Sequence, residues 1–340
     1  MHRRRFLALA LGVMVAGGCG DMGGPGAGWA RRLTIVAPVV RGRRWDQAAH
    51  ALAAILTGER MAGAVEVSGA GAQGMAALTA FAAAVGGPFA REGRVFLAGV
   101  PMLAGGETAD ADSVLAASTP LARLAGDWSV LAVSPNSLLR TFEDFVAALR
   151  RDPARLVVGG GAEGGSDHVL YGMIGKCLGV DVRLMEYAGY PTESEAVEAL
   201  HEGRVAALLG SAGSLLPKIA TGRLMPLAVS SGERIDGIDA PTLMEREVRL
   251  EYADWCGVLG PRAMSPGDRD GAVALCDRID ASPRWQAVCA ANGWHRAYLS
   301  GDDFRRWLVT ETRRTRAVLN ELGLLSIPDT NCWGGCVRRH

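Results

Sequence analysis

The segment 157–210 constrains the fold more than any other part of the chain. It begins with two valines, continues with five glycines among residues 159–165, and then opens an apolar-periodic helix at Ser166 and Asp167, both good N-cap residues. A second apolar run, a Tyr-x-Gly turn and another helical pattern follow. The pattern predicts a strand, a glycine-rich turn and a helix N-terminus, whose backbone N–H groups favour a carboxylate or a phosphate.

Two interpretations of this turn remain open: an anion site, or a tight strand-to-helix turn without a ligand. Gly159, Gly161 and Gly164 match the pattern Gly-x-Gly-x-x-Gly. However, the unit lacks the acidic residue that follows about twenty residues later in dinucleotide-binding folds. The Lys-Ser/Thr pair of a P-loop is also absent from the turn. The sequence therefore predicts no nucleotide site and no cofactor.

The alternation of short apolar strands and helices extends along most of the chain. It predicts an α/β fold in which mainly parallel sheets are flanked by helices, with ligand-facing loops at the carboxyl ends of the strands. The expected strands cover residues 33–37, 65–67, 95–99, 129–134, 157–158, 182–185, 206–209, 226–230 and 255–261. The expected helices cover residues 46–56, a segment that ends at 85, residues 141–150, and two or three more that end near 325.

The first nineteen residues have the pattern of an export signal, because three arginines precede an apolar run and small residues lead to Cys19. The arginines resemble a twin-arginine signal, and both this route and the general secretory route stay open. Residues 16–19 resemble a lipoprotein cleavage box in which Cys19 is acylated, whereas an ordinary signal with a chance cysteine is the alternative. We expect residues 1–19 to be the signal, 20–30 a flexible tether, and the mature protein to be periplasmic or otherwise extracytoplasmic.

Charge and length narrow the function further. The chain carries 36 basic and 36 acidic residues, whereas a nucleic-acid-binding protein normally has a clear basic excess, so we expect no nucleic-acid partner. A mature chain of roughly three hundred residues is long enough for two domains.

The chain has seven cysteines, which in an exported protein favour disulfides. Cys276 and Cys289 lie in successive helical patterns, and Cys332 and Cys336 flank a Trp-Gly-Gly sequence, so both pairs are disulfide candidates. Metal binding by the second pair with the terminal histidine is a weaker alternative, because there are too few ligands for a zinc site. We expect the two remaining cysteines to be buried small hydrophobes; they are Cys177 and Cys256.

Taken in order, several short motifs resemble those of the periplasmic solute-binding proteins of the tripartite tricarboxylate transporter family. The resemblance covers residues 33–325. The matching segments are 35–46, 69–72 (Gly-Ala-Gly-Ala), 120–124 (Pro-Leu-Ala-Arg-Leu), 159–168, 187–189 (Tyr-Ala-Gly), 203–206, 227–231 (Leu-Ala-Val-Ser-Ser), 240–242 (Ala-Pro-Thr) and 255–261.

The resemblance implies a two-lobed, type II-like periplasmic binding fold that closes on a small organic acid and then docks on membrane permease subunits. It implies a monomer without a cofactor. Lobe 1 would comprise residues 31–130 and 250–325, and lobe 2 would comprise 131–249, with 326–340 as a tail. By residue-level match, the ligand contacts would be Pro38, Gly42, Asp46, Gly71, Ala72, Gly161, Gly164, Gly165, Ser166, His168 and Tyr187.

The first loop departs from the family pattern, because Arg41, Arg43, Arg44 and Trp45 replace small residues. One of these arginines, with Arg44 among the candidates, would fork onto a ligand carboxylate, since a guanidinium matches that geometry. The alternative is that all three are solvated or pair with surface acids. Glu163, inside the glycine-rich turn, would repel a second carboxylate unless it points outward.

The functional interpretation is a non-enzymatic solute-binding protein. For His168, support of the turn competes with ligand contact, and for Tyr187 a core role competes with it. A sensor that reports ligand to a membrane partner is an alternative that sequence alone does not separate from a transport component. An exported hydrolase is a weaker one, because the chain has no Gly-x-Ser-x-Gly or His-Glu-x-x-His motif.

Overall fold

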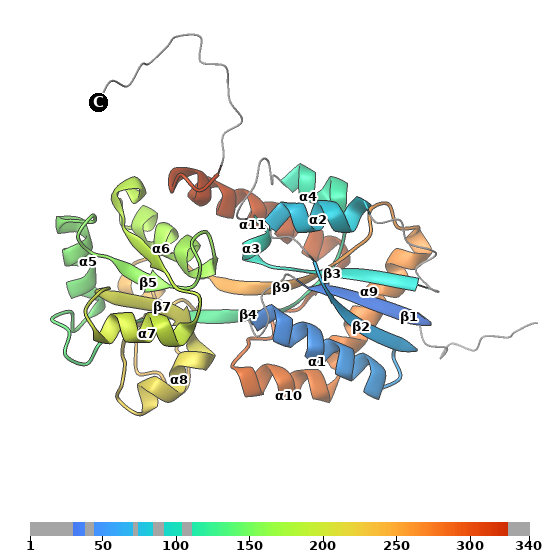
Figure 1. Ribbon diagram of the computed structural model, residues 1–340, viewed down its shortest axis with the longest axis horizontal. Helices are drawn as coiled ribbons and strands as arrows, with labels where there is room; N and C mark the ends of the chain where they lie inside the picture. The colour runs from blue at the N-terminus through green and yellow to red at the C-terminus, as the bar shows by residue number, and fades with distance from the viewer. Residues whose placement is uncertain (1–29, 38–43, 71–73, 84–91, 104–110, 326–340) are drawn as a thin grey trace, which may run out of the picture.

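The protein has two α/β lobes joined by two long strands (Figure 1). The computed structural model describes residues 30–37, 44–70, 74–83, 92–103 and 111–325. Cys19, the tail 326–340, and the predicted ligand residues Pro38, Gly42, Gly71 and Ala72 lie outside these ranges. In the described residues no helix is long and apolar enough to cross a membrane.

The strands of both lobes form one continuous order, β2-β1-β3-β9-β4-β7-β5-β6, to which β8 and β10 add by pairing with β4. In lobe 1, β1 pairs in parallel with β2 and β3, and in lobe 2, β5 pairs in parallel with β6 and β7. The strands are β1 (Arg32–Ala37), β2 (Ala64–Gly69), β3 (Glu92–Ala98), β4 (Thr119–Val133), β5 (Val158–Gly160), β6 (Tyr187–Gly189), β7 (Ala207–Ser211), β8 (Met225–Val229), β9 (Ala253–Gly260) and β10 (Leu299–Ser300).

The crossover strands β4 and β9 pass between the lobes and run antiparallel to their neighbours. The first part of β4 pairs with β9 and β10 in lobe 1, and its last residues pair with β7 and β8 in lobe 2. The sequence predicted only residues 129–134 as a strand, because Gly126 and Asp127 interrupt the apolar run. In the structure the strand continues through them, and its near-continuous burial shows that both faces are covered. The division of the lobes at residues 130 and 250 remains our proposal.

Helices flank the strands on both faces, and α11 crosses from lobe 1 to lobe 2. The N-terminal half of α11 packs on β4 and β10, and its C-terminal part lies close to α6, where Gly172 leaves room for Val318. The helices are α1 (Arg44–Gly58), α2 (Gly74–Ala83), α3 (Val100–Leu103), α4 (Ala111–Ala117), α5 (Phe142–Arg151), α6 (Ser166–Cys177), α7 (Glu193–His201), α8 (Ala212–Ala220), α9 (Pro266–Ala281), α10 (Pro283–Asn292) and α11 (Gly301–Glu321), with 3₁₀ turns at Val182–Leu184 and Met244–Arg246.

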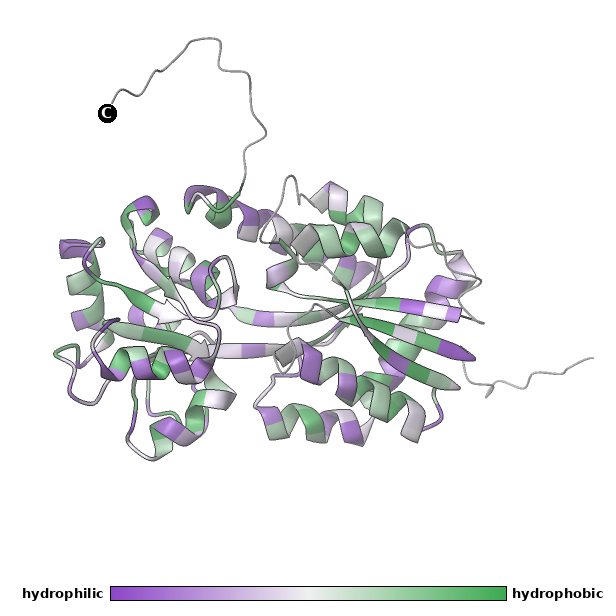
Figure 2. Ribbon diagram, viewed as in Figure 1, coloured by the Kyte–Doolittle hydropathy of each residue, from purple (hydrophilic) through white to green (hydrophobic). Residues whose placement is uncertain are grey.

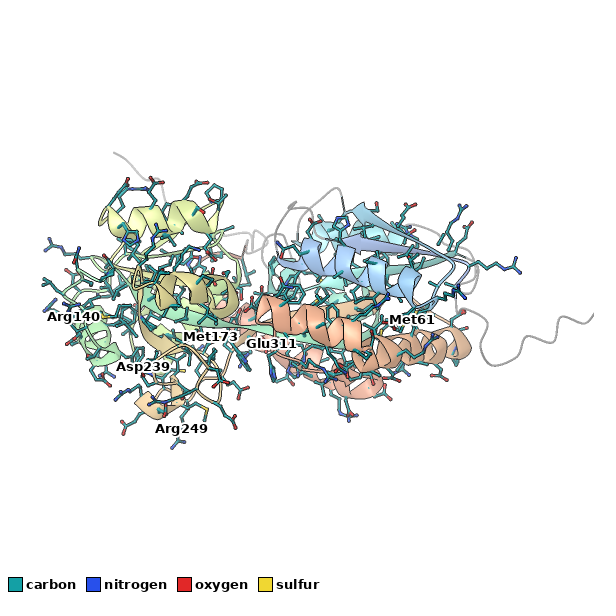
Figure 3. All side chains as sticks on the ribbon, turned by 90° about the horizontal axis from the view of Figure 1, so that it is seen from below. Met61, Arg140, Met173, Asp239, Arg249 and Glu311 are labelled. Carbon is teal, nitrogen blue, oxygen red and sulfur yellow. The ribbon has the colours of Figure 1, made fainter. Side chains whose placement is uncertain are left out.

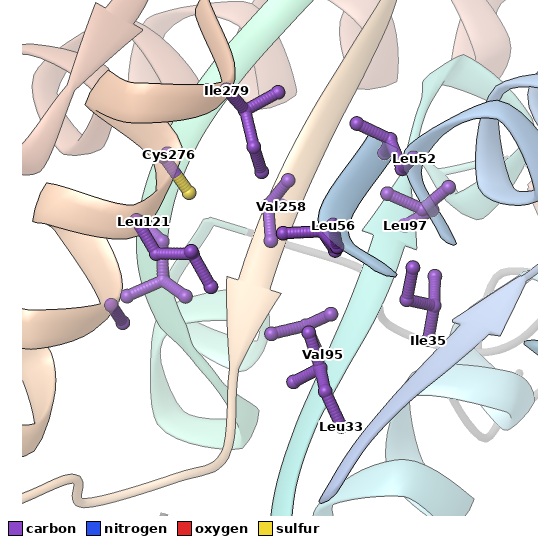
Figure 4. A pocket seen from close by; sticks show the side chains of 12 residues that line it. Leu33, Ile35, Leu52, Leu56, Val95, Leu97, Leu121, Val258, Cys276 and Ile279 are labelled. Atoms are coloured by element: carbon purple, nitrogen blue, oxygen red, sulfur yellow. The ribbon is translucent and has the colours of Figure 1, made fainter. Parts of the chain in front are cut away.

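The apolar residues are concentrated on the strands and on the inward sides of the helices (Figure 2). Lobe 1 packs around Leu33, Leu97 and Trp285, and lobe 2 packs around Leu200 and Leu208. A void of about 20 Å³ in the lobe 1 core is lined only by apolar side chains and Cys276 (Figure 4). It is too small for an organic acid and offers no charged group, so we assign it to core packing.

One strand prediction was wrong. Residues 182–185 were expected to form a strand, but Val182–Leu184 is a 3₁₀ turn whose N-cap is Asp181, with the Asp181 side chain accepting from the Arg183 N–H. The strand instead comprises Tyr187–Gly189, which was expected to be a turn and which pairs with β5. The local cap at Asp181 explains the difference, because it stops the chain from extending until it reaches β5.

Two cysteine predictions were also wrong. Cys276 and Cys289 are both free thiols, and each packs into the lobe 1 core as a small hydrophobe instead of forming a disulfide. Cys256 is buried as expected, whereas Cys177, at the end of α6, is exposed. The other disulfide candidates, Cys332 and Cys336, lie outside the described residues.

Candidate ligand-binding site

The glycine-rich turn of lobe 2 begins at the buried end of β5. Gly160 lies between β6 and the end of β7, where a Cβ atom would stand 2.5 Å from the Tyr187 Oη and 3.0 Å from the carbonyl oxygen of Leu209. Only glycine fits there without moving a neighbour. Gly164 has a φ of 72°, in the left-handed region that other residues rarely adopt. The glycines of this segment are therefore needed for the shape of the turn.

Side chains of the following helix hold the turn in place. The Gly161 N–H donates to Oδ2 of Asp167 at 2.9 Å, and the Gly164 N–H donates to Nδ1 of His168 at 3.1 Å. Several amides of the turn are thus already bonded within the protein. The sequence assigned the N-cap to Ser166 or Asp167, but the N-cap is Gly165. This correction matters because Asp167 reaches back to the turn instead of capping its own helix.

The N-terminus of α6 is left without a side-chain cap, since glycine has none to offer. The N–H groups of the first turn of a helix have no partner within the helix, and the helix dipole makes that end positive. Ser166 is buried, and its hydroxyl is hydrogen-bonded to the hydroxyl of Tyr252 at 2.9 Å. The start of α6 is therefore fixed to the segment that precedes crossover strand β9.

His168 and Tyr187 form one wall of this region. Their rings stack with centroids 4.2 Å apart and an angle of 8° between the planes. The Tyr187 hydroxyl donates to the carbonyl oxygen of Gly161 at 2.8 Å. Burial lowers the pKa of His168 to about 4, so its ring is neutral near pH 7. Because Nδ1 accepts a hydrogen bond, we place the ring proton on Nε2, which leaves one donor for another partner.

Lobe 1 contributes the start of α1. Arg44 is the first residue of this helix, and Asp46 lies in its first turn, with Oδ1 3.8 Å from Nε2 of His50. Trp45 is buried and packs against Trp294, with ring centroids 5.7 Å apart. The tryptophan of the unusual first loop is therefore a core residue, whereas the side chains of the three arginines lie outside the described residues.

The predicted residues fall into two groups on the facing sides of the two lobes. The start of α1 and the turn before α6 both lie toward the middle of the molecule (Figure 1). The predicted residues 161, 164–166, 168 and 187 are brought together within lobe 2 by the bonds described above. Asp46 belongs to the lobe 1 side.

Sequence reasoning missed polar residues on the crossover strands. Asp127 is fully buried, accepts from the hydroxyl of Ser211 at 2.7 Å, and lies opposite the buried Asp254 in the β4–β9 pairing. Tyr252, which holds Ser166, was missed as well. A signal existed, because an acidic residue followed by tryptophan occurs inside an apolar run both at 127 and at 254. In the described residues no three His, Cys, Asp or Glu side chains are grouped so as to hold a metal ion.

A sequence profile of the tripartite tricarboxylate transporter family receptor matches residues 113–324, more than half of the 340 residues. The chain belongs to this family. The matched region includes the glycine-rich turn, Tyr187, and both crossover strands.

Curated relatives match part of the chain. BugT of Bordetella pertussis is 26% identical over 204 residues, which cover 57% of this chain and 59% of BugT. A protein of the tcbD-tcbE intergenic region in a Pseudomonas strain is 30% identical over 152 residues, which cover 44% of this chain and 42% of that protein. The matches thus span only about half the length of these relatives, at 42% and 59%.

Solved structures match nearly the whole described chain. A TctC solute-binding protein from Polaromonas, without ligand, has a TM-score of 0.68 at 21% identity, covering 86% of this chain and 99% of its own. A Rhodopseudomonas palustris protein with adipate has a TM-score of 0.68 at 20% identity and covers 87% and 99%. The MatC protein of the same organism, with bound malate, has a TM-score of 0.62 at 18% identity and covers 86% and 97%. At these identities the likeness establishes the two-lobed fold.

Proposed function

We propose that this protein is an extracytoplasmic solute-binding protein that captures a small organic carboxylate between its lobes and delivers it to the membrane subunits of a tripartite transporter. The single observation that carries the proposal is the N-terminus of α6, which has no side-chain cap and follows a turn held by Asp167 and His168; we propose this turn, residues 159–165, as the ligand-binding turn. We infer a non-enzymatic role, in which ligand shifts the lobes toward a closed, docking-competent state through its greater affinity for that state.

The chemistry of the turn supports an anionic ligand. The neutral ring of His168 and the positive end of α6 supply donors without a side-chain positive charge. The acidic Asp167 is engaged with the Gly161 amide. Such a surface binds one carboxylate through backbone groups and leaves the opposite lobe to bind the rest of the ligand.

The printed ligands of the structural relatives support the same class. One relative is described with adipate and another with bound malate, both of them dicarboxylates. We propose a dicarboxylate for this protein too, with one carboxylate at α6 and the other at the loop that precedes α1. Arg41, Arg43 or Arg44 would then supply the guanidinium for the second carboxylate, as the departure of this loop from the family pattern suggests.

The test is a calorimetric and thermal-shift titration of the chain without its first nineteen residues. The panel contains adipate, malate, citrate and acetate, with uncharged adipamide as the control matched to adipate. A ligand that binds only the folded state raises the apparent stability, so we expect a concentration-dependent rise in melting temperature with a dicarboxylate and none with adipamide. The absence of a shift with every acid of the panel would contradict the proposal.

Transport is tested separately from binding. Uptake of the radiolabelled acid should fall when the gene is deleted and return when it is restored in cells that carry the membrane subunits. Unchanged uptake, together with tight binding in vitro, would favour the sensor role over the transport role.

A further inference from the structure

A second cavity lies beside the crossover strands, outside the ligand-binding turn. We call it the crossover cavity; its volume is about 300 Å³, at the lower end of the range for small-molecule pockets. Its walls come from β4, β9, the segment 295–297 and one face of α11, whose residues Trp307, Thr310, Glu311 and Arg314 follow helical spacing. Glu311 marks its position at the junction between the lobes (Figure 3).

One arginine of the cavity, Arg123, has a guanidinium whose two terminal nitrogens are available to a ligand. The Nε of Arg123 donates to the carbonyl oxygen of Ala297 at 2.6 Å, and its guanidinium lies over the ring of Trp307 at 4.2 Å. No described residue forms an ion pair with Arg123 or a hydrogen bond to its two terminal nitrogens. The stem and the plane of the guanidinium are therefore fixed, while the two nitrogens that grip a carboxylate remain available.

Besides Arg123, the charged residues that line the cavity are Arg314, Glu311 and Glu251, so an anion bound at Arg123 also meets two carboxylates. Arg314 is paired with the buried Glu311 at 2.8 Å, so these two charges compensate each other. Burial lowers the pKa of Arg123, and the charges of Glu311 and of the exposed Glu251, which both line the cavity, oppose this shift. His295 has a pKa lowered by partial burial and by the charge of Arg123, which favours its neutral form. A second carboxylate on a ligand would meet Glu251 and Glu311, so a dicarboxylate is disfavoured.

The remaining walls are aromatic. The rings of Trp128 and His295 lie 4.9 Å apart at one side, and the buried ring of Trp255 packs edge-on against Trp307 at 5.4 Å. The Trp255 Nε1–H is buried and has no hydrogen-bond partner among the described residues, which is uncommon in native proteins. A flat ring on a ligand, placed next to these indole rings, would gain contact area and a favourable ring–ring geometry.

We propose that the crossover cavity is a second binding site, selective for a small monocarboxylate that carries a flat ring, with the carboxylate on the Arg123 fork and the ring among Trp128, His295 and Trp307. The site is distinct from the ligand-binding turn, and its walls come from both crossover strands.

The test uses benzoate as the probe and isothermal titration calorimetry as the measurement. We expect benzoate to bind, and benzamide, which has the same shape without the charge, to bind at least about tenfold more weakly, as loss of a charge-assisted hydrogen bond predicts. Excess adipate should not displace benzoate. The titration uses benzoate at up to a roughly 20-fold excess over the protein and at concentrations up to about 10 mM. If no benzoate binds under these conditions, the proposal is overturned, since binding weaker than this is not selective.

Two variants locate the probe. Arg123→Gln should weaken benzoate about tenfold or more, while Arg296→Gln, which removes a neighbouring arginine paired with Asp280, should change its affinity less than about twofold. Thr310→Trp, at an exposed position on the cavity wall, should block binding without touching the core. Its matched control is Ala317→Trp, two turns further along α11 and equally exposed.

The outcomes separate this site from the one between the lobes. Loss of benzoate binding in Thr310→Trp with retained adipate binding supports the proposal, even if Arg123→Gln proves unstable. If both cavity variants bind benzoate like the unaltered protein, or if Tyr187→Phe alone weakens it, benzoate binds in the ligand-binding turn and the proposal is wrong.

Discussion

The proposed ligand-binding turn and the crossover cavity present positive electrostatic character in opposite ways. The turn offers backbone amides and a helix end, supported by Asp167 and His168 from the same helix. The cavity offers the guanidinium of Arg123, supported by Trp307 and Ala297 from distant parts of the chain. The comparison indicates that backbone recognition is encoded locally, within about ten residues, whereas side-chain recognition is assembled by the tertiary fold.

The largest effect should come from Gly160→Val, which separates the two regions. The added side chain meets Tyr187 and the Leu209 carbonyl, and overpacking of this kind costs about 1 to 3 kcal/mol of unfolding free energy. We expect dicarboxylate binding to be lost while benzoate still binds, as measured by calorimetry and urea denaturation. Gly267→Ala, which has open space at its Cβ, is the matched control and should be neutral. Simultaneous loss of both ligands in a folded variant would contradict the separation.

The second effect is the pH dependence of the unfolding free energy that His168, next to the turn, contributes. Burial lowers the pKa of His168 to about 4, so its unfolded state binds more protons between pH 6.5 and 4. The stability from the neutral ring is therefore complete above pH 6.5 and is lost as the pH falls toward 4. Between pH 7 and pH 5 we expect a loss of about 2 kcal/mol that His168→Gln removes, measured by urea denaturation.

The control for this prediction is His201→Gln, at an exposed histidine of the same lobe. It should retain the full pH dependence of the unaltered protein. An equal pH dependence in His168→Gln would show that another group titrates. His295→Gln, in the crossover cavity, should remove less of the loss, because His295 is less buried than His168.

The third effect tests the hydrogen bond between Ser166 and Tyr252, which joins the two regions. Tyr252 lines the crossover cavity, and its hydroxyl is bonded to Ser166 at the start of α6. Tyr252→Phe and Ser166→Ala should each cost about 1 kcal/mol of stability, and the double variant should cost less than their sum. The measurement is a double-mutant cycle by urea denaturation. Strict additivity would mean that the hydroxyls do not interact in solution.

The smallest effect concerns Glu163, which is exposed within the turn. Glu163→Gln should strengthen dicarboxylate binding about twofold at low salt, because a like charge is removed from the approach of the ligand. The gain should disappear near 1 M salt, whereas benzoate affinity should not change. Glu202→Gln, at another exposed acid of lobe 2, is the matched control for net charge. Weaker dicarboxylate binding in Glu163→Gln would indicate that Glu163 contacts the ligand.

Much of the fold could be predicted because its signals are local. The first strand and helix, β5 with its glycine-rich turn, and the helix at Thr141 follow the sequence patterns closely, and Thr141 forms the capping box that such a sequence favours. The prediction failed at residues 182–189, where the apolar run is a 3₁₀ turn and the strand forms one step later. Pairing with β5 decided the position of that strand, and no local pattern contains this information.

The sequence by itself determined the alternation of strands and helices, the glycines of the turn and the family to which the protein belongs, because these depend on residues near one another in the chain. Only the tertiary structure decided that Tyr187 stacks on His168, that Cys276 and Cys289 stay apart, and that Arg123 meets Ala297, 174 positions away. The physical reason is that burial and pairing bring distant segments together, and the contacts they create have no period or spacing in the sequence.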